Sequence, residues 1–248
     1  MLYLIICPMV FLAGFIDSIA GGGGLISLPA YMFAGLPVHN AIATNKLSSF
    51  MGTSLATYSF AKKGFIKLKL AFMPLLFALA GSAIGAKIAL RTDGRNFRLF
   101  MLLILPIVAF YVFRTKEIKG GGDIYSEKKT ILLSIPISFG VGIYDGFYGP
   151  GTGTFLILLL TGFAKMSLNS AAGITKAINL STNIAALAIY ISSGKTIIAL
   201  GIIAGIFNIA GNYLGTRVFI NKGSSSVRPV ILIVLVLFFI KLITELFW

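Results

Sequence analysis

The sequence contains very few of the residues that build soluble surfaces, disulfide frameworks or metal centres. Its 248 residues include one cysteine, one histidine and seven acidic residues, and 11% are charged, against about 25% in a typical soluble domain. Cys7 alone cannot form an internal disulfide, and with His39 alone it makes no metal cluster. We therefore expect no metal and no cofactor, and the shortage of polar residues excludes a soluble globular fold.

Apolar sequence, in contrast, is abundant. Hydrophobic residues make up 57% of the chain, and an apolar run of roughly 20 residues spans a bilayer as a helix. So many such runs predict an all-α integral membrane protein that crosses the cytoplasmic membrane several times, with the lipid bilayer as its partner. The stretches almost free of charge are 1–45, 70–86, 99–113, 130–164 and 230–240.

The net charge of +14 has to be explained within that class. In a soluble protein, 21 Lys and Arg against seven Asp and Glu would suggest nucleic acid. Here the basic residues lie mostly in short loops between apolar runs, which is how positive residues are retained on the cytoplasmic face. We therefore expect no nucleic-acid partner.

The chain contains one unit twice. The second copy follows the first at an offset of 128 residues at one motif and 130 at the next two. This near-constant offset predicts one membrane domain made of a first repeat, 1–115, a polar and Gly-rich linker, 116–129, and a second repeat, 130–248. The matching motifs are 14–17 (GFID) with 142–145 (GIYD), 43–46 (ATNK) with 173–176 (GITK), and 81–87 with 211–217. The last pair carries the small-xxx-small spacing of tightly packed membrane helices.

Each repeat has four apolar segments, of which the first is interrupted by glycines. If both interrupted segments were single spans, there would be eight simple transmembrane helices and parallel repeats, with ten basic loop residues on one side and eight on the other. If both are re-entrant hairpins, the repeats are inverted. One side of the membrane then carries thirteen basic loop residues and the other carries five, which obeys the positive-inside rule better. We favour the inverted arrangement. The segments are 2–35, 40–61, 68–90, 97–114, 131–163, 168–191, 196–219 and 229–247.

The candidate site lies at the interrupted segments. Asp17 and Asp145 are at equivalent positions inside them, while the other five acidic residues lie in loops or near the C-terminus. The repeat also places Lys46 and Lys176 near the starts of the next segments. A charge inside a membrane costs about 2.5–3.5 kcal/mol and is by default functional. The other interpretation is an internal Asp–Lys pair that ties two segments together, and one aspartate is a candidate proton carrier.

The glycine-rich breaks contribute backbone groups to the candidate site. A helix interrupted at membrane depth exposes unpaired N–H groups, and the helix that restarts points its positive dipole end into the gap. Exposed amides and a positive dipole form an anion site. The predicted binding residues are Gly21, Gly22, Gly23, Gly24, Asn45, Lys46, Gly149, Gly151, Thr152, Gly153, Thr154, Thr175, Lys176 and Asn179. Further hydroxyl and amide groups close to them in sequence are Thr44, Ser48, Ser49, Ser181, Thr182 and Asn183.

These residues resemble the TauE/SafE sulfite exporter family. The resemblance is carried by GFIDSIAGGGGLISLPA (14–30), ATNKLSSF (43–50), GIYDGFYGPGTGTFL (142–156) and GITKAINL (173–180), and it covers both halves of the chain. It implies movement of sulfite or an organosulfur anion, such as a sulfonate, across the bacterial cytoplasmic membrane.

The sequence therefore predicts a secondary transporter for a small anion, working by alternating access. No phosphate-binding loop, HExxH or GxSxG motif supports an enzyme. An anion channel and a non-transporting membrane scaffold are the alternatives, and a homodimer is compatible with the sequence.

Overall fold

The computed structural model describes residues 2–93 and 124–222, which form helices and no strands within those ranges. Five of the helices, α1, α4, α6, α8 and α9, are long and apolar enough to cross a membrane. This confirms the predicted all-α membrane class. The helices are α1 (Leu2–Ala20), α2 (Gly24–Phe33), α3 (Val38–Lys62), α4 (Leu68–Arg91), α6 (Glu127–Phe147), α7 (Thr152–Gly162), α8 (Leu168–Ser192) and α9 (Ile198–Lys222).

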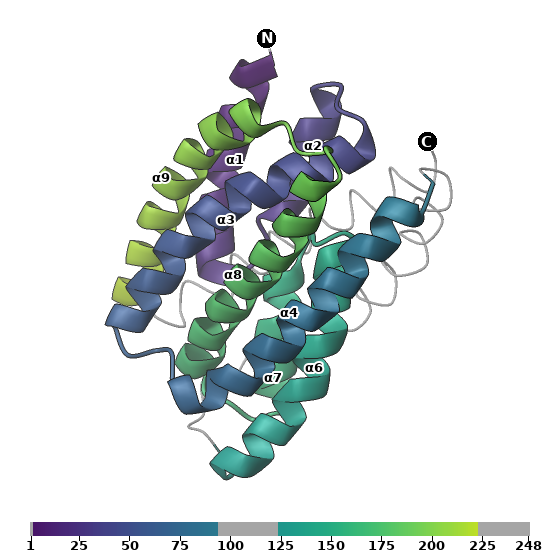
Figure 1. Cartoon of the computed structure of the whole chain (residues 1–248). Coiled ribbons are helices and arrows are strands. Elements are labelled where there is room, and N and C mark those ends of the chain that lie inside the picture. The colour runs from purple at the N-terminus through teal and green to yellow at the C-terminus, as the bar shows by residue number, and fades with distance from the viewer. Residues whose placement is uncertain (1, 94–123, 223–248) are drawn as a thin grey trace, which may run out of the picture.

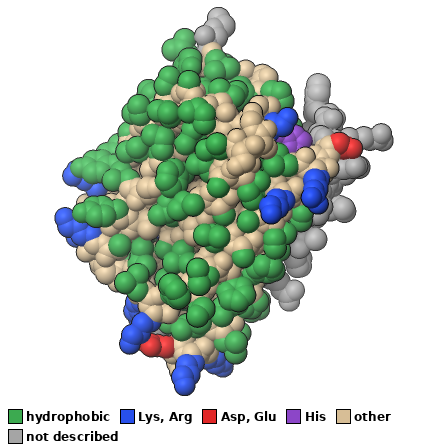
Figure 2. Space-filling view, viewed as in Figure 1, with side chains coloured by type: hydrophobic (Ala, Val, Ile, Leu, Met, Phe, Trp, Pro, Cys, Tyr) green, Lys and Arg blue, Asp and Glu red, His purple; other side chains and the backbone are tan. Residues whose placement is uncertain are grey.

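The helix bounds follow the predicted apolar segments closely. The uninterrupted segments 40–61, 68–90, 168–191 and 196–219 are α3, α4, α8 and α9. The segments predicted at 97–114 and 229–247, and most of the predicted linker, lie outside the described residues. Hydrophobic side chains cover most of the visible face, with Lys and Arg gathered toward its edges (Figure 2). That distribution suits a surface in contact with lipid.

Each interrupted segment is two helices separated by a short glycine-containing turn. α1 ends at Ala20 and α2 begins at Gly24, and α6 ends at Phe147 and α7 begins at Thr152. Glycine is needed in these turns because the backbone has positive φ there, +78° at Gly21 and +99° at Gly149. With 10 and 11 residues, α2 and α7 are too short to span a bilayer alone.

The helices of the two halves are interleaved. α9 packs along α1, and α4 packs along α6 (Figure 1). Both contacts use the predicted small-residue motifs, because a Cβ on Gly85 would overlap the carbonyl of Ile143, and a Cβ on Gly211 would overlap that of Phe11. The backbones therefore approach closely, as the small-xxx-small spacing predicted.

α3 and α8 lie against each other in the middle of the molecule (Figure 1). Their contact is polar: the Thr57 hydroxyl donates to the Lys176 carbonyl at 3.0 Å, and the Asn183 amide donates to the Thr53 hydroxyl at 3.4 Å. Lys176 is 1% exposed and Asn183 is 6% exposed. A buried polar seam thus runs through an otherwise apolar protein and leads to the candidate site.

Candidate substrate-binding cavity

The two glycine-rich turns meet each other. The Thr154 N–H donates to the Gly21 carbonyl at 3.3 Å, and its hydroxyl donates to the Ala20 carbonyl at 2.7 Å. The approach is close enough that a Cβ on Gly21 would overlap the backbone of Gly153, and the reverse is also true. Glycine at these two positions is what brings the N-terminal ends of α2 and α7 to one place.

Both lysines predicted from the repeat form ion pairs with the two intramembrane aspartates, and each pair joins one half to the other. Lys46 Nζ lies 2.6 Å from Asp145 Oδ2, with side chains 4% and 8% exposed. Lys176 Nζ lies 3.0 Å from Asp17 Oδ2, with side chains 1% and 20% exposed, and it also donates to the Asp17 carbonyl. The four charges sum to zero.

Each aspartate also binds its own glycine turn. Asp145 Oδ1 accepts from the Thr152 hydroxyl at 2.8 Å. Asp17 Oδ1 accepts from the Gly23 N–H at 3.4 Å. The carboxylates therefore hold a lysine of one half against the helix start of the other.

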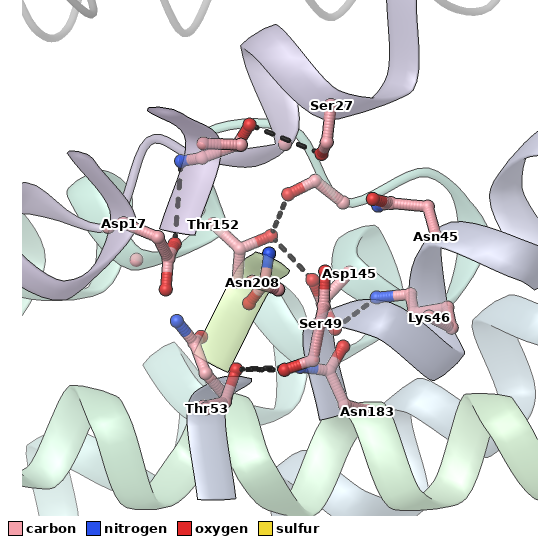
Figure 3. A pocket seen from close by; sticks show the side chains of 17 residues that line it. Asp17, Ser27, Asn45, Lys46, Ser49, Thr53, Asp145, Thr152, Asn183 and Asn208 are labelled. Carbon is pink, nitrogen blue, oxygen red and sulfur yellow. Dashed lines mark hydrogen bonds and ion pairs between the residues drawn. The ribbon is translucent and has the colours of Figure 1, made fainter. Parts of the chain in front are cut away.

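A cavity of about 40 Å³ lies between the turns, the ion pairs and the α3–α8 seam (Figure 3). Seven helices or their turns contribute side chains or backbone to its wall. Most of the residues predicted from the sequence are among them: Asp17, Gly21, Gly23, Gly24, Asn45, Lys46, Asp145, Gly149, Thr152, Gly153 and Asn179.

Five of the predicted residues do not line the cavity. Lys176 is behind Asp17, and Thr154 is engaged in the contact between the turns. Gly151 is the N-cap of α7 with φ of +81°, and the Gly22 carbonyl accepts from Leu25. Thr175 is fully buried in α8.

Two wall residues have amide oxygens without a hydrogen-bond partner among the described residues. These are Asn45 Oδ1 and Asn179 Oδ1, in residues that are 8% and 7% exposed. Buried polar atoms in proteins are nearly always paired, so such an exception calls for an explanation. Their position on the cavity wall makes a group that donates a hydrogen bond, such as a water molecule or a protonated ligand, the natural partner of these oxygens.

The sequence prediction missed three polar wall residues, Ser27, Thr53 and Asn208. Asn208 reaches the cavity from α9 (Figure 3). It could have been recognised in the sequence as an amide in the middle of an apolar segment. The repeat gave no help, because the 130-residue offset pairs it with Ala78. Ser49 and Asn183, which were noted in the sequence only as nearby polar groups, also line the cavity.

An all-helical fold with five apolar spans in its described part and a polar cavity fits a multi-pass membrane transporter, and relatives carry the name of a membrane transporter. A protein of Sinorhizobium described as "Probable membrane transporter protein ORF9" is 33% identical over 95% of this chain and 90% of its own length. A "Probable membrane transporter protein" of Haemophilus influenzae is 32% identical over 96% and 93%. The Bacillus subtilis "Probable membrane transporter protein YdhB" is 25% identical over 86% and 89%.

The family model "Sulfite exporter TauE/SafE" matches residues 6–242, so the chain belongs to that family. This confirms the resemblance seen in the motifs. No solved structure matches the chain.

Proposed function

We propose that this protein is a secondary transporter that moves a small anion, sulfite or an organosulfur anion such as a sulfonate, across the cytoplasmic membrane by alternating access. The observation that carries the proposal is the cavity between the two glycine turns. The first residues of α2 and α7, Gly24 and Thr152, both line it. Helix N-termini attract anions through free N–H groups and the helix dipole.

The size of the cavity favours a small cargo. A water molecule needs roughly 10–15 Å³ of such space, so about 40 Å³ holds about three water-sized groups. A three-oxygen anion matches that room. A larger sulfonate would place its anionic head group in the cavity and would need the wall to move for the rest of the molecule.

Inverted repeats with re-entrant hairpins support an alternating-access mechanism, and we include them in the proposal. The charge count of the loops favours them. The exchange of contacts between the halves supports two equivalent repeats, in either orientation. The contact of α1 with α9 corresponds to that of α6 with α4, and the pair Asp17–Lys176 corresponds to Asp145–Lys46.

The topology is tested with single cysteines in a Cys7→Ser background. Lys63→Cys marks the α3–α4 loop and Lys195→Cys marks the α8–α9 loop. Inverted repeats place the two loops on opposite sides of the membrane, so an impermeant thiol reagent added outside cells should label only one. Equal labelling of both would establish the parallel arrangement instead.

Transport is tested in proteoliposomes with labelled sulfite and a panel of sulfonates. We expect uptake by the wild-type protein and its loss in the Lys46→Ala/Lys176→Ala variant. Wild-type rates in a folded double variant would refute the site. Flux that ignores an imposed proton gradient would favour an anion channel, and no flux of any anion would favour a membrane scaffold.

A further inference from the structure

We propose that the cavity selects singly charged oxyanions over doubly charged ones of the same shape. The inference rests on the proposed anion transport and deepens it, by stating the charge of the cargo. Hydrogensulfite and sulfonate head groups then belong to the preferred class, whereas the sulfite dianion and sulfate do not.

The first argument is the charge of the side chains. Lys46 is neutralised by Asp145, and Lys176 is neutralised by Asp17. Among the described residues, Asp17, Lys46 and Asp145 are the ionisable side chains on the wall, and Lys176 is paired to Asp17 behind it. The site therefore offers an anion no net positive charge from its side chains.

The second argument is the charge of the helix ends. Each helix N-terminus is equivalent to roughly half a positive charge. α2 and α7 both begin on the wall, at Gly24 and Thr152. Together they supply about one positive charge, which balances a monoanion and leaves a dianion half neutralised.

The third argument is the set of uncharged polar groups. Asn45 and Asn179 line the cavity and are more than nine-tenths buried, and their side-chain amide N–H groups donate to no other described residue. The Ser49 hydroxyl lies on the same part of the wall. Neutral donors replace part of an ion's hydration shell without adding charge. The desolvation cost of an ion rises with the square of its charge, so a neutral buried wall discriminates against the dianion.

The test compares anions of one shape and different charge. Chlorate and the sulfite dianion are both pyramidal with three oxygens, and methanesulfonate and sulfate are both tetrahedral. Dissociation constants are measured by titration calorimetry on the purified full chain, at an alkaline pH where sulfite is mainly the dianion. We expect chlorate and methanesulfonate to bind at least tenfold more tightly than sulfite and sulfate respectively.

Because dianions are more strongly hydrated in any case, a charge variant supplies the decisive comparison. Asp145→Asn leaves Lys46 unneutralised and adds one positive charge beside the ligand. It should shift the chlorate-to-sulfite preference roughly ten- to a hundredfold toward sulfite, since the dianion gains twice the Coulomb energy. Glu127→Gln removes the same charge from the exposed start of the same helix and should leave the ratio unchanged.

Where Asp145→Asn does not fold, Asp17→Asn makes the same charge change at the more exposed pair. An unchanged ratio in a folded aspartate variant, or a wild-type preference for dianions, would overturn the inference while leaving anion transport intact. If the wild-type protein binds and transports none of the four anions, the proposed function itself fails.

Discussion

Lys46 and Asp145 form an ion pair across 2.6 Å, although they lie 99 residues apart and in different halves of the chain. Both side chains are more than nine-tenths buried. The carboxylate has a second partner in Thr152 at the start of α7. This pair is therefore both a fastening between the halves and part of the cavity wall.

Breaking that pair should destabilise the protein strongly. Lys46→Met leaves the Asp145 charge buried without its counterion, which should cost about 3–5 kcal/mol of folding free energy. The double variant Lys46→Met/Asp145→Asn removes both charges and should recover most of the loss. Thermal unfolding in detergent measures both. A single variant as stable as the wild type would show that the pair contributes nothing to folding.

The second pair should be less sensitive. The Asp17 side chain is 20% exposed, and Lys176 keeps its bond to the Asp17 carbonyl when the carboxylate is lost. Asp17→Asn should therefore cost about 1–3 kcal/mol, less than Asp145→Asn in the same assay. The reverse order would mean that water reaches the Asp145 pair more readily than its burial indicates.

Asn179→Ala should affect binding without affecting stability. Neither its amide oxygen nor its amide N–H groups have a hydrogen-bond partner among the described residues, so truncation leaves no protein group unpaired and removes a donor to the anion. Loss of a hydrogen bond to a charged ligand costs about 1.5–3 kcal/mol, roughly a ten- to hundredfold rise in the dissociation constant. The matched control is Asn40→Ala, whose side chain bonds the Lys195 carbonyl at the surface. Equal affinities of the two variants would remove Asn179 from the site.

The contact between the turns should not accept a methyl group. A Cβ on Gly153 would overlap the Gly21 backbone and lie 3.0 Å from Asn179 Nδ2. We expect Gly153→Ala to abolish transport and lower the melting temperature. Gly140→Ala is the control, because a Cβ there meets nothing within 4 Å. This variant should gain about 0.5–1 kcal/mol of folding stability, since alanine favours a helix over glycine. Transport by Gly153→Ala at the wild-type rate would show that the turns need not touch.

Much of the described fold could be predicted from the sequence because membrane helices are recognisable as long runs of apolar residues. The four uninterrupted segments within the described residues match their helices to within three residues at either end. The glycine breaks were visible too, because runs such as Gly21–Gly24 interrupt an apolar segment. The side of the membrane on which each turn opens depends on loop charges, and that part stays a prediction.

The cavity was predictable only where the repeat marked it. Asp17, Asp145 and Lys46 stood out because a charge in an apolar segment recurred at an equivalent position. Their exact pairing did not follow from the pattern, since either lysine could have met either aspartate. Asn208 lies on α9 and Thr53 on α3, and both reach the wall because of the way these helices cross the others. The crossing angles depend on tertiary packing, which cannot be deduced from the sequence of one chain.

The reciprocal ion pairs have a consequence for how the chain enters the membrane. Asp17 and Lys46 are synthesised long before their partners, Lys176 and Asp145. Until the second half is inserted, neither has its partner of the folded protein, and a charge without a counterion in the membrane costs about 2.5–3.5 kcal/mol. We therefore expect the first half to remain incomplete until the second half supplies Lys176, Asp145 and the contact with its glycine turn. We expect insertion in two stages, in which neither half alone is stable in a membrane without the other.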